Sequence, residues 1–342
     1  HGKSMFLEIL EESGSFQLYF RKNLLEENMD EGAFDRAKEL DIGDFIAARG
    51  ELFTTRTGEP TLMALEWMLL SKALLPLPEK YHGLADPELR LRQRYLDLIV
   101  NPEVGRNLRV RALVIKGIRD YLENDHGYIE METPALTPLY GGAAARPFTT
   151  HHNALDLELY LRIATELYLK RLIVGGFERV YEMGKVFRNE GVDRDHNPEF
   201  TLLELYEAYA DYGRMMDLAE GMVVYCARLA AEYIERNPIS DADGNIIEPH
   251  ISVTDGVVTI ESEKENIVIE PPFPRISFTE AIAEATGIDV LDSDRGEILD
   301  WFDSREIDCN RDLQYWPLVD KLFSEAVEPG LIQPVFLVDF PV

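Results

Sequence analysis

The chain has 342 residues, 46% of them hydrophobic, and this composition predicts a folded protein of two domains rather than a disordered one. No apolar run is long enough to span a bilayer and no signal peptide opens the chain, so we expect a cytoplasmic protein without a membrane anchor. The only cysteines are Cys226 and Cys309, so we expect neither a disulfide scaffold nor a cysteine metal site. The formal net charge of −29 argues against a basic nucleic-acid surface over the whole molecule, but residues 213–342, with 9 basic and 27 acidic side chains, hold most of the excess.

Residues 1–74 have the pattern of a small β-domain. SMFLEIL and SFQLYF alternate as short strands and are joined by the turn EESG. Residues 26–44 predict one short helix closed by Gly43, and residues 44–70 predict strand, turn and strand. Short strands with one helix between them suit an OB-fold β-barrel, although any other small β-domain would have a similar composition.

Residues 75–100 predict a proline-marked linker followed by a basic helix that joins the two domains. From residue 101 to the end the pattern is mixed, with an amphipathic helix over residues 103–126 and then the strand YIEMETPAL. Pro134 lies within that strand and lacks an amide donor, so it suits a sheet edge or an interface. The fold class is therefore predicted as α+β.

An acidic stretch over residues 238–272 alternates strongly between apolar and polar residues. It contains the turn sequences DGN at residues 243–245 and DG at residues 255–256. Both are typical hairpin turns, so we expect acidic β-hairpins inserted into a helical surround.

The run FRNEGVDRDHNPEFTLLELYEAY, residues 187–209, combines charged residues with a strand pattern. In a strand, Glu204 shares a face with Phe200 and Tyr206, where a carboxylate is costly unless it meets a cation or several donors. Arg188 lies on the preceding arm of the predicted hairpin. Either Arg188 and Glu204 form a structural ion pair, or the hairpin binds a ligand that carries both charges. The residues alone leave these two interpretations nearly even.

FRNEG followed by HNPEFTLLELYEAYADY resembles motif 2 of the class II aminoacyl-tRNA synthetases. RYLDLIVN, GYIEMETPAL (motif 1), the run from GGAAARPF to FRNEG, and QPVFLVDFPV are similar in order and spacing to the lysyl-tRNA synthetases, with the weakest match over residues 238–272. Glu204 favours the lysyl type over the aspartyl and asparaginyl relatives, because an acidic substrate would need a different residue there. The resemblance implies an OB-fold anticodon-binding domain, followed by a catalytic domain built on an antiparallel sheet with flanking helices.

The activity that the resemblance implies is that of a lysine–tRNA ligase: ATP-dependent activation of L-lysine to lysyl-adenylate, then transfer to tRNA(Lys). Arg188 is the implied catalytic residue, because a guanidinium can bridge the α-phosphate of ATP and the carboxylate of lysine. The implied lysine site consists of Gly142, Glu166, Arg188, Glu204 and Tyr206. The implied ATP site consists of Arg188, Glu190, His196, Asn197 and Phe200, the last by stacking on adenine. Phe6 and Gln17 match positions that stack on and hydrogen-bond anticodon bases, although by spacing alone Phe6 reads as a core residue.

The chain departs from the family pattern in a few places. Thr165 stands where the family usually has proline, which we interpret as a minor local change. The chain begins without methionine and ends on a strand-like run at Val342, so we expect both ends to be cut, the first barrel strand to be missing and motif 3 to lie beyond the end. The implied magnesium ligands would also lie beyond Val342, so we expect no metal site within this chain and no activity for the chain by itself.

The implied partners are L-lysine, ATP with Mg²⁺, tRNA(Lys) and a second copy of the chain, with no membrane. The homodimer would form through motif 1, which consists of the helix over residues 103–126 and the strand containing Pro134. Two alternatives stay open. One is a synthetase-like paralogue that transfers lysine to a protein or another acceptor, and the other is a non-catalytic RNA-binding module.

Overall fold

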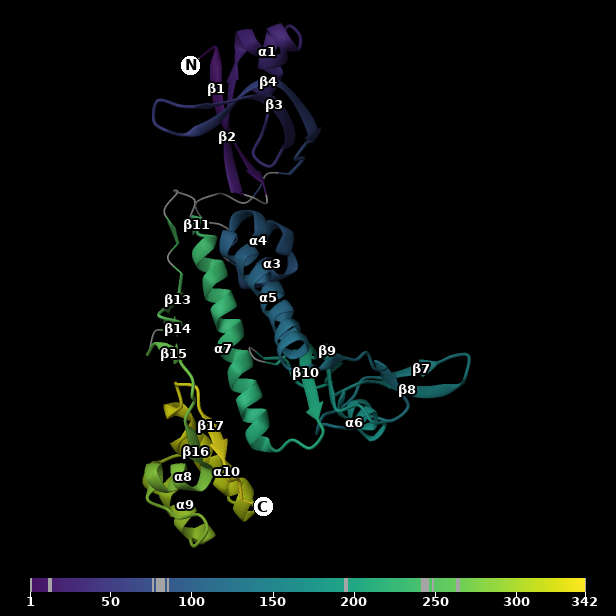
Figure 1. The fold of residues 1–342 in the computed structure, drawn as a ribbon, viewed down its shortest axis with the longest axis vertical. Helices are drawn as coiled ribbons and strands as arrows, with labels where there is room; N and C mark the ends of the chain where they lie inside the picture. The colour runs from purple at the N-terminus through teal and green to yellow at the C-terminus, as the bar shows by residue number, and fades with distance from the viewer. Residues whose placement is uncertain are drawn as a thin grey trace. The chain divides into compact units, whose positions relative to one another are not determined.

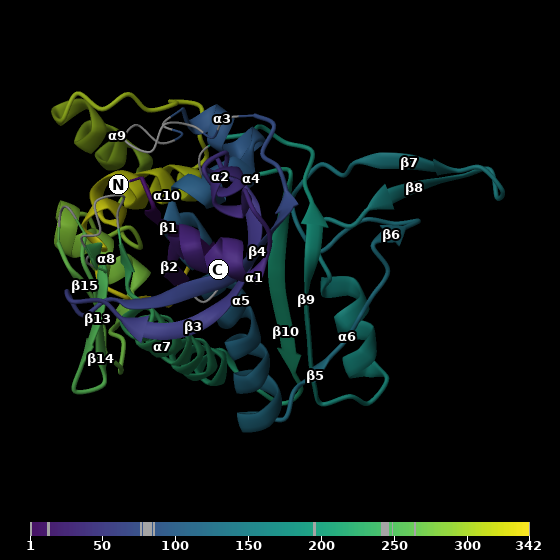
Figure 2. The ribbon, with the colours of Figure 1, turned by 90° about the horizontal axis from the view of Figure 1, so that it is seen from above.

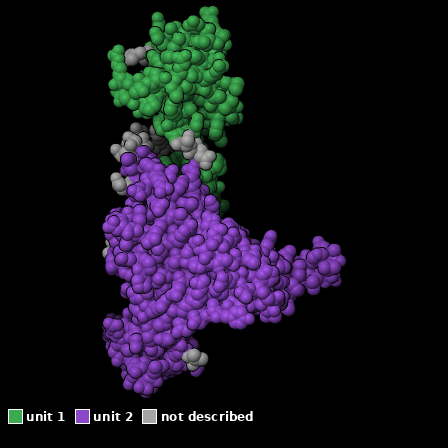
Figure 3. Space-filling model, viewed as in Figure 1, with its two compact units in different colours: residues 1–102 green, residues 103–342 purple. Residues whose placement is uncertain are grey.

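The chain forms two compact units in a computed structural model, His1–Pro102 and Glu103–Val342 (Figure 3). The structure describes residues 2–11, 14–75, 77, 84, 86–193, 196–240, 246–247, 249–262 and 265–341. Much of the predicted linker therefore lies outside the described residues, as do the DGN turn at residues 243–245 and the two central residues of the EESG turn.

The first unit is built on a four-stranded sheet (Figure 1). Its strands are β1 (Ser4–Glu11), β2 (Gly14–Arg21), β3 (Phe45–Thr54) and β4 (Pro60–Ser71), in the order β1-β2-β4-β3. β2 pairs in parallel with β4, and the other pairs are antiparallel. Leu18 and Phe20 alternate along β2 with zero exposure and form the core with Leu25 and Phe34. The predicted strands are confirmed.

The single helix expected over residues 26–44 is wrong. Two short helices form instead, α1 (Lys22–Asn28) and α2 (Ala33–Ala37). Gly32 separates them with a φ of 94°, a left-handed conformation that interrupts a right-handed helix and that glycine adopts without strain. Gly43 lies beyond the end of α2.

The predicted basic helix is a pair, α3 (Pro87–Arg92) and α4 (Arg94–Val100). Asp97 has zero exposure, and its carboxylate accepts hydrogen bonds from Arg90 at 2.7 Å and from Arg94. Arg90 of α3 therefore links the two helices through the buried carboxylate of Asp97, whereas Arg94 pairs with Asp97 within α4.

The second unit contains a three-stranded sheet in the order β10-β9-β5. Its strands are β5 (Ile129–Glu130), β9 (Arg179–Phe187) and β10 (Glu199–Glu207). The long helices are α5 (Pro102–Asp120), which continues into a π-helical turn at Tyr121–Asp125, and α7 (Tyr212–Arg236). These helices lie side by side in Figures 1 and 2, and a Cβ on Gly221 of α7 would come within 2.1 Å of the Tyr121 hydroxyl.

The strand expected through Pro134 is shorter than predicted. Only Ile129–Glu130 pairs with β9, in parallel, and the next strand is β6 (Leu136–Thr137). Pro134 lies between these two strands rather than within one. Its missing amide explains why no ladder continues through it.

The remaining elements form smaller sheets and a helical end. β6 pairs with β8 (Leu157–Leu161), which pairs with β7 (Thr149–His152), and α6 (Glu166–Val174) follows. Within the acidic stretch lie β11 (Ile239–Ser240), β12 (Ile246–Ile247), β13 (Ile251–Thr254), β14 (Val257–Ile260) and β15 (Ile267–Ile269). β16 (Arg275–Ser277) pairs in parallel with β17 (Phe336–Val338). One apolar core is shared by α8 (Phe278–Thr286), α9 (Arg295–Ser304) and α10 (Tyr315–Ala326), and a 3₁₀ turn (Glu328–Gly330) follows α10.

The predicted hairpin at residues 255–256 is confirmed. Asp255 and Gly256 have φ values of 52° and 82°, the pair of left-handed residues that a tight two-residue hairpin turn needs, and they join β13 to β14. Both cysteines are free, with Cys226 buried. Among the described residues, every helix is too short or too polar to cross a membrane.

Candidate active site

The hairpin of β9 and β10 brings the predicted polar residues onto one face of the sheet. Glu204 lies directly opposite Glu182, and Phe200 lies opposite Val186. The Arg188 amide continues this pairing by donating to the Pro198 carbonyl at 2.9 Å. Side chains alternate along both strands, so Arg188, Phe200, Glu204 and Tyr206 face the same side. The predicted sharing of a face is confirmed.

Arg188 and Glu204 do not form the structural ion pair that the sequence left open. Their pairing positions differ by six residues along β10, which is about 20 Å at about 3.3 Å per residue. The Arg188 guanidinium instead lies 5.0 Å from the centre of the Phe200 ring. Its Nε is buried, and within the described part of the chain it has no hydrogen-bond partner. Arg188 therefore has donor capacity that no described residue uses.

Glu204 is held by neutral donors rather than by a cation. The Thr165 amide donates to Glu204 Oε2 at 2.8 Å, and the Thr165 hydroxyl donates to the same oxygen. Thr165 immediately precedes α6 and is 2% exposed. No ion pair to Glu204 occurs among the described residues, so hydrogen-bond donors alone hold its carboxylate.

The opposite carboxylate, Glu182, has a different environment although it shares the face. Glu182 is 3% exposed, pairs with Arg162 and accepts a hydrogen bond from the Thr133 hydroxyl at 2.6 Å. Arg162 passes close to the strand at Gly184, where a Cβ would lie 2.5 Å from the guanidinium. Glu182 is thus a neutralised internal ion, whereas Glu204 is half-buried and not neutralised.

Tyr206, Glu166 and Gly142 lie near Glu204. Burial raises the pKa of Tyr206 to about 12, and the negative charges of Glu204 and Glu166 contribute to this rise. Lys170 pairs with Glu166 at 2.6 Å and lies 5.8 Å from the centre of the Tyr206 ring. Gly142 has a φ of 86°, and a Cβ there would lie 2.9 Å from the Glu166 Cβ. Four of the five residues predicted for the lysine site therefore lie near the start of α6, whereas the fifth, Arg188, lies toward the other end of the hairpin.

The loop residues predicted to bind ATP are exposed. Glu190, His196 and Asn197 lie between β9 and β10 with exposed side chains, and His196 Nδ1 is 2.8 Å from the Asp193 carboxylate. Within the described residues, no contact joins the three to Arg188 or Phe200. Two loop residues, 194 and 195, lie outside the described part.

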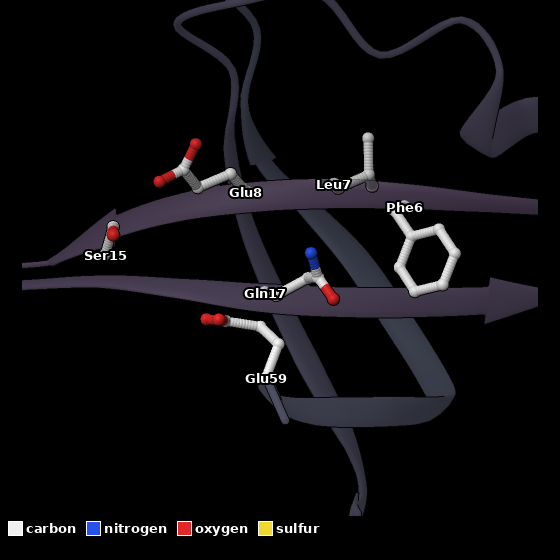
Figure 4. Close-up of a pocket in the computed structure, with 6 residues that line it drawn as sticks. All are labelled: Phe6, Leu7, Glu8, Ser15, Gln17 and Glu59. Atoms are coloured by element: carbon white, nitrogen blue, oxygen red, sulfur yellow. The ribbon is translucent and has the colours of Figure 1, made fainter. Parts of the chain in front are cut away.

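A second polar surface lies on the sheet of the first unit (Figure 4). A pocket of about 300 Å³ is lined by Phe6, Leu7, Glu8, Ser15, Gln17 and Glu59. Phe6 is 55% exposed, so the interpretation of it as a core residue is wrong. The side-chain carbonyl oxygen of Gln17, Oε1, accepts a hydrogen bond from the Thr61 hydroxyl at 2.8 Å. Within the described residues its amide N–H groups have no partner, so they remain able to donate.

Sequence reasoning missed three contributors to these surfaces. Tyr19 stacks beside Phe6 with 4.7 Å between ring centres, and the strand pairing places Tyr19 opposite Phe6. Lys170 follows Glu166 by four residues, a spacing that predicts a helical ion pair. Thr165 is a residue type that often precedes a helix, and that was the only signal for it.

Comparison with known proteins gives matches over both units. Residues 86–342 match the family described as tRNA synthetases class II (D, K and N), and residues 1–70 match the OB-fold nucleic acid binding domain. The lysine–tRNA ligase of Moorella thermoacetica is 45% identical over 348 residues, covering 100% of this chain and 64% of that protein. Those of Clostridium novyi and Dehalococcoides mccartyi are both 46% identical, covering all of this chain and 62% and 63% of their own lengths.

The chain thus spans less than two thirds of the length of the curated relatives it matches. The synthetase family covers three quarters of the chain and includes both strands of the β9–β10 hairpin, so the likeness extends to the residues that carry the candidate site. The first unit, which carries the pocket beside Phe6, corresponds to the OB-fold domain. The chain belongs to the family of class II tRNA synthetases (D, K and N).

Proposed function

We propose that the protein containing this chain is a lysine–tRNA ligase, which activates L-lysine with ATP and transfers it to tRNA(Lys). The observation that carries the proposal is the Glu204 carboxylate, which is half-buried on a sheet face, accepts two hydrogen bonds from neutral donors and has no ion pair among the residues that the structure describes. A ligand ammonium would supply the missing charge. The names of the relatives at 45–46% identity support the same substrate.

Lysine recognition would use both ends of the substrate. The ε-ammonium would bind Glu204 and lie beside Tyr206, whereas the α-ammonium would bind Glu166 near the Gly142 backbone. A neutral side chain would leave the Glu204 charge partly desolvated and unpaired, which costs enough to reject it strongly. The backbone positions of Glu204 and Arg188 are about 20 Å apart along the strand. Both side chains shorten the gap between their charged groups, and one extended lysine would bridge the remaining distance.

Activation would be a displacement at the α-phosphate of ATP. A lysine carboxylate oxygen forms a bond to the α-phosphorus, and the bond to the pyrophosphate oxygen breaks. The attacking group is already an anion, so the reaction needs alignment and charge neutralisation rather than a general base. Arg188 would neutralise the two approaching anions, and its unpartnered buried Nε supports this role. Phe200 would stack on adenine, with Glu190, His196 and Asn197 as further ATP contacts from the loop.

Magnesium would accompany ATP in the whole protein. The described residues contain no group of three acidic, histidine or cysteine side chains that could hold a metal ion. The Mg²⁺ that accompanies ATP would be held mainly by the phosphates and water, with one or two protein carboxylates.

The first unit would bind the anticodon of tRNA(Lys). The exposed Phe6 ring offers a stacking surface for a base, and the Gln17 amide offers hydrogen-bond donors beside it. A homodimer through motif 1 is supported by apolar side chains on both sides of Pro134, since Ile129 is 50% exposed and Leu136 48%. Charging of tRNA for protein synthesis would place the protein in the cytoplasm.

Lysine-dependent ATP–pyrophosphate exchange by the full-length protein tests the proposal. We expect exchange with lysine and none with aspartate or asparagine. Formation of lysyl-tRNA with tRNA(Lys) then separates a tRNA ligase from an enzyme that uses another acceptor. Exchange with aspartate or asparagine but not lysine would refute the assigned substrate.

A further inference from the structure

Thr165 is placed to orient the Glu204 carboxylate. Its backbone amide lies 2.8 Å from Glu204 Oε2, and its hydroxyl donates to the same oxygen. Thr165 is 2% exposed, so water competes little for either donor. Two donors fixed to one backbone position on a single oxygen restrict the carboxylate to one orientation.

The Thr165 hydroxyl does not perform the usual task of a threonine in its position. Thr165 is the residue before the first turn of α6, where a threonine side chain commonly accepts a hydrogen bond from an amide of that turn. Here the side chain makes no such bond and is directed to β10 instead. The Thr165 side chain therefore contacts Glu204 instead of capping α6.

The other carboxylate oxygen, Glu204 Oε1, accepts no hydrogen bond from a described residue, and it is not among the buried atoms that lack a partner. It therefore reaches solvent on the face that carries Tyr206. We propose that Thr165 is a positioning residue for amino-acid selection, which holds Glu204 Oε2 so that Oε1 is presented to the ligand ammonium. This inference rests on the proposed lysine specificity and adds a residue to it.

The test compares Thr165→Val, which removes the hydroxyl at nearly constant shape, with Thr165→Ser, which keeps it. Steady-state ATP–pyrophosphate exchange on the full-length protein gives KM for lysine and for ATP. For Thr165→Val we expect KM for lysine to rise about five- to tenfold, with KM for ATP changed less than twofold. Thr165→Ser should recover most of the lost affinity. Thr286→Val is the matched control, because that hydroxyl bonds the Ile282 carbonyl within α8, away from the hairpin.

A double-mutant cycle with Glu204→Gln distinguishes positioning from a general structural role. If Thr165 acts through Glu204, then Thr165→Val has little further effect on lysine binding in the Glu204→Gln background. Additive losses, or equal rises in KM for lysine and ATP, would overturn the inference, as would an unchanged KM for lysine in Thr165→Val. In those cases normal wild-type exchange leaves the proposed function intact. A wild-type protein without lysine-dependent exchange would instead refute the proposed function, and this inference with it.

Discussion

Replacing Glu204 with glutamine tests the charge that the proposed function needs. The substitution keeps the shape of the side chain and removes the negative charge. The carboxamide oxygen can still accept the two hydrogen bonds from Thr165 that now end on Oε2. The amide nitrogen would then occupy the position of Oε1 and direct its hydrogens at the ligand ammonium. A favourable contact between opposite charges becomes a contact between two donors.

The size of the loss follows from the burial of the site. Removing one partner of a buried, hydrogen-bonded charge pair costs about 2–5 kcal/mol. Glu204 is half-buried, so the lower part of that range applies, and about 2–3 kcal/mol corresponds to about 30- to 150-fold weaker lysine binding. ATP would bind near Arg188 and Phe200, remote from Glu204 along β10, so ATP binding should change less than about twofold.

The measurement is KM for lysine and for ATP in pyrophosphate exchange, with Glu199→Gln as the matched control. Glu199 lies on the same strand but faces the other side, and it forms an exposed ion pair with Lys185 at 3.2 Å. Such pairs contribute little, so this variant should behave as the wild type does. Equal weakening of lysine and ATP binding by Glu204→Gln would show that Glu204 is structural and would refute the reasoning.

Three further outcomes are expected. Gly142→Ala should raise KM for lysine about tenfold or more, because the new Cβ would lie 2.9 Å from the Glu166 Cβ; Gly176→Ala, equally left-handed at a φ of 102° but with open space around it, should not. Phe6→Ala should weaken tRNA binding by about 1–3 kcal/mol in a filter-binding assay without changing pyrophosphate exchange, and an equal effect on both would contradict the assignment of Phe6 to RNA. Glu207→Gln should make the free energy of unfolding fall less steeply as the pH is lowered, measured by urea unfolding at several pH values. Burial opposes the charge of Glu207, but its hydrogen bonds outweigh burial and lower the pKa, so its stabilisation is present above about pH 4.5 and is lost as the pH falls below that value; an unchanged dependence on pH would contradict this.

Alternation along single strands was enough to predict much of the site. Period-two patterning placed Glu204 and Tyr206 on one face of a hairpin, and the pairing of β9 with β10 confirms it. The same reasoning failed where one residue decided the backbone. Gly32 separates two short helices where the pattern predicted one, and Pro134 lies between two strands where the pattern predicted a single strand. Both effects are local properties of the backbone, a left-handed glycine and a proline without an amide, and a hydrophobic pattern does not contain them.

Hydrogen bonds between segments distant in sequence could not be predicted from the hydrophobic pattern. Thr165 and Glu204 are separated by 39 residues, and no pattern in either segment indicates that they meet. Thr165 was therefore interpreted as a minor local change, whereas the structure gives it two hydrogen bonds to the central carboxylate of the site. Spacing alone likewise favours a core position for Phe6, against the anticodon role that the resemblance implies, because the exposure of a strand face depends on what packs against it.

The same limit explains why sequence alone could not separate Glu182 from Glu204. Both are glutamates in strand positions, and the register places them opposite each other on one face. The difference lies in Arg162, whose Nε donates to the Lys185 carbonyl at 2.8 Å while the guanidinium pairs with Glu182 above Gly184. Because its nitrogens already bond these groups, Arg162 pairs with Glu182 and not with Glu204. Two like charges directly opposite each other are unfavourable unless each is offset, and no ion pair to Glu204 occurs among the described residues, which agrees with the proposal that a ligand ammonium binds there.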